Sequence, residues 1–136
     1  MADGIRILVV DDEESIRKFV ARVLREAGYE VLVAASGPAA LTTVEQNGPF
    51  DLFVFDMMMP EMSGAELARR LRLIHPDAQI LYFTGFSDAL FNERSTLWAH
   101  EAFLDKPATT AGLLEAVSLL LCGHTTAPRA SPFARG

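Results

Sequence analysis

The sequence is poor in cysteine and has no long apolar run, and each scarcity excludes a class of protein. Its one cysteine, Cys122, cannot form a disulfide within the chain and has no partner at CxxC spacing for zinc. No apolar stretch approaches the length of about 20 residues that a bilayer-spanning helix needs. The 136 residues, 50% of them hydrophobic, therefore have to fold by packing, and they suffice for one domain with a core.

Positive charge is also scarce. The chain has 12 Lys and Arg against 18 Asp and Glu, a net charge of −6, and four acids run together at positions 11–14. This balance argues against direct binding to the phosphate backbone of nucleic acids. The first ten residues contain one Arg and no small-residue cleavage site after their apolar letters, so they do not resemble a signal peptide. We expect a cytoplasmic protein without a membrane partner.

Short apolar runs alternate with segments of helical periodicity. Strands are predicted at residues 5–10, 29–34, 52–55, 80–83 and 102–104, and helices at 14–27, 37–47, 67–74, 88–98 and 113–121. The segment 88–98 has the least regular apolar face. This alternation predicts a doubly wound α/β fold, a five-stranded parallel sheet covered by five helices. We expect residues 1–121 to form the domain and residues 122–136, which lack periodicity, to be a flexible tail or linker stub.

Polar residues follow the predicted strands. They are Asp11 and Asp12 after the first strand, Asp56 after the third, Thr84 after the fourth and Lys106 after the fifth. In a parallel sheet these ends share one edge, where ligands of such folds bind. Clustered carboxylates repel one another unless they share a cation, and a site of carboxylate and water oxygens suits Mg²⁺.

Phosphoryl transfer onto a carboxylate needs this set of groups. Such transfer depends on positioning and on cationic stabilisation of the phosphoryl oxygens, and an ionised Asp56 can attack phosphorus without a general base. Lys106 and the Thr84 hydroxyl can each take one phosphoryl oxygen. Ten of the twelve cations are Arg, so a Lys at this strand end fits a role as a compact point charge. Asp11 and Asp12 alone could merely cap the following helix, and only the joint arrangement favours function.

The same residues resemble the receiver domain of two-component response regulators, from about Ile5 to Leu121. The matching motifs are the strand ending in Asp11-Asp12, Asp56-Met57-Met58-Met59-Pro60 followed by Gly64, Phe83-Thr84-Gly85, and Phe103-Leu104-Asp105-Lys106-Pro107. The resemblance implies the flavodoxin-like receiver fold with strand order 2-1-3-4-5 and a phosphoryl group accepted on Asp56. It implies Mg²⁺ bound by Asp11, Asp12, Asp56 and the Met58 backbone carbonyl. It also implies a cis peptide between Lys106 and Pro107.

The resemblance further implies a switch. Thr84 and Lys106 would sense the phosphoryl group, and Phe103 would turn into the space that Thr84 vacates, remodelling the face formed by the fourth helix, fifth strand and fifth helix. As a separate hypothesis, Met58 and Phe86 flank the site, and their apolar bulk limits the access of water to the aspartyl phosphate. The expected partners are a histidine kinase or histidine phosphotransfer protein, a downstream target protein and, as a further option, a second copy in a phosphorylation-dependent homodimer.

The chain could also be the receiver segment of a hybrid sensor kinase, which keeps the fold and changes only the context. Two functions of other classes fit less well. A Mg²⁺-dependent phosphohydrolase with an aspartyl nucleophile typically has a second acid two residues later, where this chain has Met58. A flavodoxin-like electron carrier would bind phosphate after the first strand, where the acids at 11–14 would repel it. We therefore expect a signalling switch that catalyses only its own phosphorylation and dephosphorylation.

Overall fold

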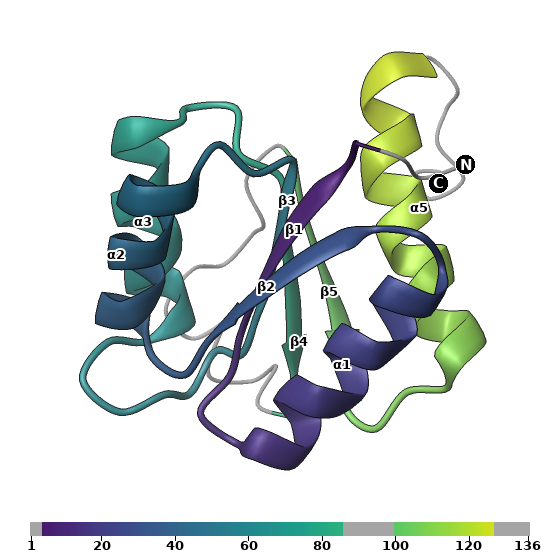
Figure 1. The fold of residues 1–136 in the computed structure, drawn as a ribbon, viewed down its shortest axis with the longest axis horizontal. Coiled ribbons are helices and arrows are strands. Elements are labelled where there is room, and N and C mark those ends of the chain that lie inside the picture. Colours follow the sequence, from purple (N-terminus) through teal and green to yellow (C-terminus); the bar gives the residue numbers. More distant parts are fainter. Residues whose placement is uncertain (1–3, 86–99, 127–136) are drawn as a thin grey trace.

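Strands and helices alternate along the chain in a computed structural model that describes residues 4–85 and 100–126 (Figure 1). The elements are β1 (Arg6–Val10), α1 (Glu14–Glu26), β2 (Glu30–Ala34), α2 (Gly37–Asn47), β3 (Leu52–Phe55), α3 (Gly64–Ile74), β4 (Ile80–Thr84), β5 (Glu101–Asp105) and α5 (Thr110–Thr126). The five predicted strands are confirmed, and so are four of the helices. The helix predicted at 88–98 lies outside the described residues.

The sheet is parallel with the order β2-β1-β3-β4-β5, which confirms the predicted order. In the centre, Val9 of β1 is in register with Val33 of β2 and Val54 of β3. At the edge of the sheet formed by β5, Thr84 of β4 is in register with Asp105 of β5. Because all neighbouring strands are parallel, their carboxyl ends share one edge of the sheet.

Successive side chains of each strand point to opposite faces and build two cores. In β1, Leu8 and Val10 pack into the core beneath α2 and α3, whereas Ile7 and Val9 pack into the core beneath α1 and α5. Figure 1 shows the two pairs of helices on opposite sides of the sheet. Burial on both faces explains why the central strands read as continuous apolar runs.

Local signals set the ends of three helices. The Ser36 hydroxyl accepts the backbone N–H of Ala39 at 3.2 Å, and the Ser63 hydroxyl accepts that of Glu66 at 3.1 Å, so each serine satisfies a donor of a first helical turn. Helix α1 is followed by Gly28 with φ 102°, a left-handed conformation that glycine adopts without steric cost.

Helix α5 is longer than predicted at both ends. The Thr109 hydroxyl accepts the N–H of Gly112 at 2.9 Å, so the helix begins before its first apolar position. It continues to Thr126, beyond the predicted boundary at 121, because helical hydrogen bonding does not depend on apolar periodicity. Residues 122–126, the start of the segment expected to be a flexible tail, are therefore helical. A flexible tail stays a prediction for residues 127–136.

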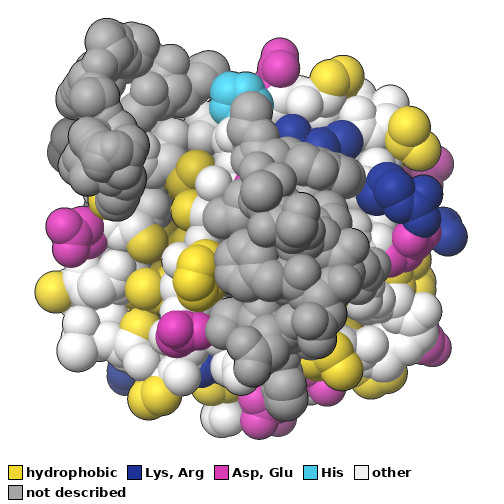
Figure 2. Space-filling view, turned by 180° about the vertical axis from the view of Figure 1, so that it is seen from behind, with side chains coloured by type: hydrophobic (Ala, Val, Ile, Leu, Met, Phe, Trp, Pro, Cys, Tyr) yellow, Lys and Arg dark blue, Asp and Glu magenta, His cyan; other side chains and the backbone are white. Residues whose placement is uncertain are grey.

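The surface of α3 mixes charges of both signs. Glu66 receives a hydrogen bond from Arg70 Nε at 2.7 Å and one from Arg69, and these bonds, that from Arg70 first, hold the pKa of the Glu66 carboxyl below its ordinary value. Figure 2 shows basic and acidic side chains next to each other on the side of the molecule where α3 lies. Within residues 4–85 and 100–126, no helix is long and apolar enough to cross a membrane.

Candidate phosphoacceptor and metal site

The predicted site residues meet at the carboxyl edge of the sheet. Asp11 follows β1 directly, Asp56 follows β3, and Lys106 follows β5, while Thr84 is the last residue of β4. This edge lies at the bottom of Figure 1, where the arrowheads of β4 and β5 point. The positions that the sequence picks out at strand ends are therefore brought together by the parallel sheet.

Asp11 is buried, with 3% of its surface exposed, and both of its carboxylate oxygens are engaged. Oδ1 accepts the backbone N–H of Glu13 at 2.9 Å, and Oδ2 accepts Lys106 Nζ at 2.9 Å. Burial raises the pKa of the Asp11 carboxyl above its ordinary value, although the Glu13 amide and the Lys106 ammonium act in the opposite direction. The fold thus holds this carboxylate in an environment that opposes its charge.

Asp56 is equally buried, at 3% exposure. Its Oδ2 accepts Lys106 Nζ at 3.2 Å, and its Oδ1 accepts the backbone N–H of Met58 at 3.4 Å. Gly64, the first residue of α3, lies directly against the backbone that carries this aspartate, and its N–H donates to the Met57 carbonyl at 2.8 Å. A Cβ at position 64 would lie 2.9 Å from Met57 Cα and still closer to the Asp56 carbonyl oxygen, so only glycine fits here.

Lys106 connects the two buried carboxylates. Its Nζ lies 2.9 Å from Asp11, 3.2 Å from Asp56 and 3.7 Å from Glu13 Oε1, and it approaches the ring of Phe83 to 5.7 Å from the centroid. Burial by itself lowers the pKa of this ammonium, but the hydrogen bond and charge of Asp11, together with Asp56, outweigh burial and raise it. Lys106 is therefore held in its charged form. The peptide bond from Lys106 to the following proline is cis, the isomer expected from the resemblance.

The acidic residues fit a divalent cation. Oxygens of Asp11, Asp12 and Asp56 all lie within 4.8 Å of one another, with Asp11 and Asp56 buried and Asp12 exposed. An all-oxygen set of a few carboxylates that is open to water on one side is the donor set that Mg²⁺ prefers. This geometry supports the predicted metal residues, whereas the part of the Met58 carbonyl in binding the metal stays a prediction.

Thr84 and Phe103 occupy the last two strands. Thr84 is fully buried, and its carbonyl accepts the backbone N–H of Lys106 at 3.1 Å, which ties the end of β4 to the residue after β5. Phe103 is 38% exposed on β5 and is in register with Tyr82 of β4. These positions are compatible with the predicted roles, in which the Thr84 hydroxyl senses the phosphoryl group and the partly exposed Phe103 ring responds on the neighbouring strand.

Two contributors to the site were not anticipated. Glu13 was considered only as part of an acidic run, yet its carboxylate reaches Lys106. Gly64 was noted only as part of a motif. Its position directly after Ser63, which caps α3, was the sign in the sequence that the start of this helix packs closely against another backbone segment. Of the two predicted rim residues, Met58 is 47% exposed, while Phe86 lies outside the described residues.

The fold and the carboxyl edge of its sheet together define a class of protein. The class is a parallel α/β domain with a buried aspartate, a lysine and an acidic cluster at its strand ends. Residues 7–118 match the family described as response regulator receiver domain. The chain belongs to this family and is thus a receiver domain of two-component signalling.

The relatives include both small regulators and kinases. The response regulator receiver protein CpdR of Brucella abortus is 35% identical over 85% of this chain and 96% of its own length. The sensor kinase CckA of the same organism is 37% identical over 89% of this chain, which spans 13% of that kinase. Among solved structures, the response regulator TrrA of Thermotoga maritima in complex with Mg²⁺ and BeF superposes with a TM-score of 0.74 at 39% identity, covering 86% of this chain and 99% of that one.

Proposed function

We propose that this receiver domain accepts a phosphoryl group on Asp56 from a histidine kinase or a histidine phosphotransfer protein. The observation that carries the proposal is the position of the Lys106 ammonium between the buried carboxylates of Asp11 and Asp56. A lysine that only stabilised the fold would not require three clustered acids beside it. The same residues serve a stand-alone regulator and a receiver segment of a hybrid kinase, because all of them lie between positions 11 and 106.

The chemistry follows from the groups present. A carboxylate oxygen of Asp56 attacks phosphorus, the bond from phosphorus to the donor histidine nitrogen breaks, and that nitrogen leaves with the electron pair. No general base is needed, because an ionised carboxylate is already a nucleophile. Lys106 then neutralises one phosphoryl oxygen, and the Thr84 hydroxyl donates a hydrogen bond to another.

Asp11, Asp12, Asp56 and the Met58 carbonyl would hold Mg²⁺. The ion supplies positive charge that offsets the repulsion between the carboxylates and the incoming phosphoryl group. Lys106 has to loosen its bond to Asp56 for that group to enter, and its shorter contact with Asp11 keeps the ammonium in place meanwhile.

The signal would leave through the last two strands. Movement of Thr84 towards the phosphoryl group opens space beside β5, and the partly exposed Phe103 turns inward to occupy it. The surface of β5 and α5 changes as a result, and a downstream protein, or a second copy of the chain, reads the change. Met58 and Phe86 at the rim would slow hydrolysis by limiting the access of water to the aspartyl phosphate.

A small phosphodonor tests the acceptor. With Mg²⁺ and acetyl phosphate, intact-protein mass spectrometry should detect one added phosphoryl group on the wild-type chain and none on Asp56→Asn. Asp51→Asn is the matched control, because Asp51 precedes the same strand and lies at its other end. Phosphorylation of the Asp56→Asn variant, or none of the wild type, would refute the proposal.

The rim residues need a separate test. Met58→Asn should shorten the lifetime of the aspartyl phosphate, because a polar side chain can hold water near phosphorus. Met62→Asn, on the same loop, provides a control for the change in polarity. Equal hydrolysis rates for wild type and Met58→Asn would eliminate the role of Met58.

A further inference from the structure

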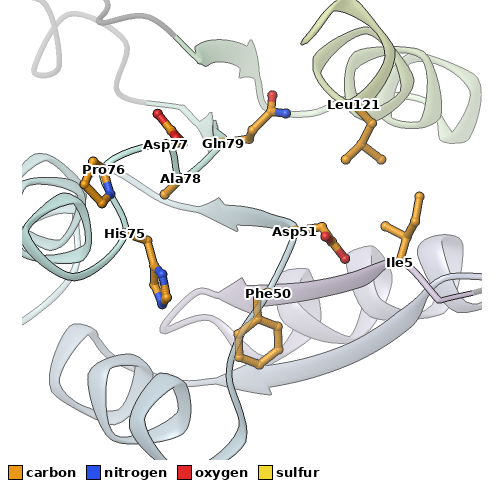
Figure 3. Close-up of a pocket in the computed structure, with 9 residues that line it drawn as sticks. All are labelled: Ile5, Phe50, Asp51, His75, Pro76, Asp77, Ala78, Gln79 and Leu121. Carbon is orange, nitrogen blue, oxygen red and sulfur yellow. The ribbon is translucent and has the colours of Figure 1, made fainter. Parts of the chain in front are cut away.

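A cavity of about 530 Å³ opens at the amino edge of the sheet, opposite the acidic cluster (Figure 3). Its walls come from the start of β1, the loop before β3, the loop between α3 and β4, and α5. The lining residues are Ile5, Phe50, Asp51, His75, Pro76, Asp77, Ala78, Gln79 and Leu121. None of them takes part in the proposed phosphoryl transfer.

The cavity combines apolar walls with unneutralised negative charge. Ile5, Phe50 and Leu121 are half-buried, whereas Asp51 and Asp77 are exposed. Among the described residues, no lysine or arginine lines the cavity, and neither aspartate forms an ion pair with a cation. The carboxylate of Asp51 accepts the backbone N–H of Arg6, at 2.8 Å.

Two guanidiniums beside the cavity are already engaged. Arg72 donates to the Pro76 carbonyl at 3.1 Å and pairs with Glu101 at 3.5 Å. Arg6 stacks on the Phe50 ring at 4.7 Å, but its NH1 donates to the carbonyls of Asn47 and Pro49 at 2.6 and 2.7 Å, and its Nε pairs with Glu30 at 3.3 Å. The cavity therefore suits an occupant that supplies both a cation and an apolar group.

The chain carries such a segment directly after α5. Residues 127–136 contain Arg129, Phe133 and Arg135 and no acid, in a protein with a net charge of −6. Leu121 lines the cavity, and α5 ends at Thr126, about 7 Å further along the helix axis at 1.5 Å per residue. Ten residues span up to about 33 Å when extended, so this segment can turn back and reach every wall.

We propose that residues 127–136 dock into the amino-edge cavity of their own chain. Phe133 packs against the apolar wall of Ile5, Phe50 and Leu121, and the two arginines pair with Asp51 and Asp77. The cavity is then an intramolecular docking site at the end of the sheet furthest from Asp56. The proposal is independent of phosphorylation.

Paramagnetic relaxation tests the docking. A nitroxide is attached through Ala134→Cys in a chain that also carries Cys122→Ser, and amide signals of the ¹⁵N-labelled protein are recorded. We expect a loss of signal for residues 50–51, 75 and 77–79, since Pro76 has no amide proton, and none for the carboxyl-edge residues Asp12 and Met59. Undiminished amide signals at 75 and 77–79, or equal losses at both edges, would overturn the proposal.

Two further experiments test whether the signal loss comes from docking within one chain: substitutions in the segment or the cavity, and a mixture of spin-labelled and ¹⁵N-labelled protein. Phe133→Ala, and separately Asp51→Asn with Asp77→Asn, should restore the lost signals. Glu26→Gln with Glu45→Gln removes the same charge from exposed helical sites that do not line the cavity and should restore nothing. Spin-labelled protein without ¹⁵N is finally mixed with ¹⁵N protein without the label: broadening of 75 and 77–79 in this sample would show that the segment binds a second copy, which also contradicts the proposal.

Discussion

Replacing Gly64 by alanine should destabilise the domain, although helix propensity alone predicts the opposite. Gly64 is the first residue of α3, and alanine in a helix is favoured over glycine by about 0.5–1 kcal/mol. The new Cβ would, however, lie 2.9 Å from Met57 Cα and 3.1 Å from the Asp56 carbonyl carbon. Both atoms belong to the backbone, so neither can rotate away.

The magnitude follows from these opposing effects. Inserting a methyl group into a packed site typically costs about 1–3 kcal/mol, and more where the backbone must shift. Met57 is 1% exposed, so the backbone at this point is enclosed and has little room to relax. We expect a net loss of about 2 kcal/mol in the free energy of unfolding after the propensity gain is subtracted. Phosphorylation should slow as well, because the displaced backbone carries Asp56.

Denaturant unfolding monitored by circular dichroism measures the change, with Gly85→Ala as the control. A Cβ at position 85 would meet no atom within 4 Å. Gly85→Ala should therefore be close to neutral. A Gly64→Ala protein as stable as the wild type would show that the close approach of α3 to the Asp56 backbone does not constrain the fold.

Three further predictions concern the same edge of the sheet. Because the pKa of the Asp11 carboxyl is raised, the folded state keeps a proton that the unfolded chain releases near pH 3.8. Without Mg²⁺, the wild type should therefore lose stability relative to Asp11→Asn as pH rises above that value. A difference in unfolding free energy between the two proteins that stays the same at all pH values would contradict this. Mg²⁺ should raise the melting temperature of the wild type and raise it less in Asp12→Asn, as measured by calorimetry against Ca²⁺-free and Mg²⁺-free samples. Ser63→Ala should cost about 1 kcal/mol through loss of the α3 cap, and no change in the unfolding midpoint would show that the cap is replaced by water.

The sequence predicted the strand ends well because one physical rule governs them. A strand buried on both faces is a continuous apolar run, and the first polar residue after it marks the carboxyl end. Asp11 and Asp56 were identified in this way, whereas Lys106 was identified from the motif Asp105-Lys106-Pro107 after the shorter fifth strand; the parallel sheet brings all three together. Neither their separation nor the lysine's place between the carboxylates follows from apolar periodicity.

What the sequence did not predict depends on three-dimensional approach. The contact of Glu13 with Lys106 joins residues far apart in the chain, and a run of four acids gives no sign of which one reaches the lysine. The close packing of Gly64 depends on the angle at which α3 meets β3. The extra turns of α5 contain small and polar residues, whose helical state is not encoded by an apolar stripe.

The charge balance of the site separates the needs of function from those of the fold. Asp11, Asp12 and Asp56 carry three negative charges when ionised, and Lys106 carries one positive charge. Two negative charges therefore remain at the carboxyl edge of the sheet, where two of the three carboxylates are buried. Burial, together with the charge of Asp56, raises the pKa of Asp11, so the folded chain does not favour this charge. Apolar residues at these positions would stabilise the sheet better. The acids therefore carry a cost in stability that a divalent cation can offset, and the proposed acceptance of a phosphoryl group accounts for their presence.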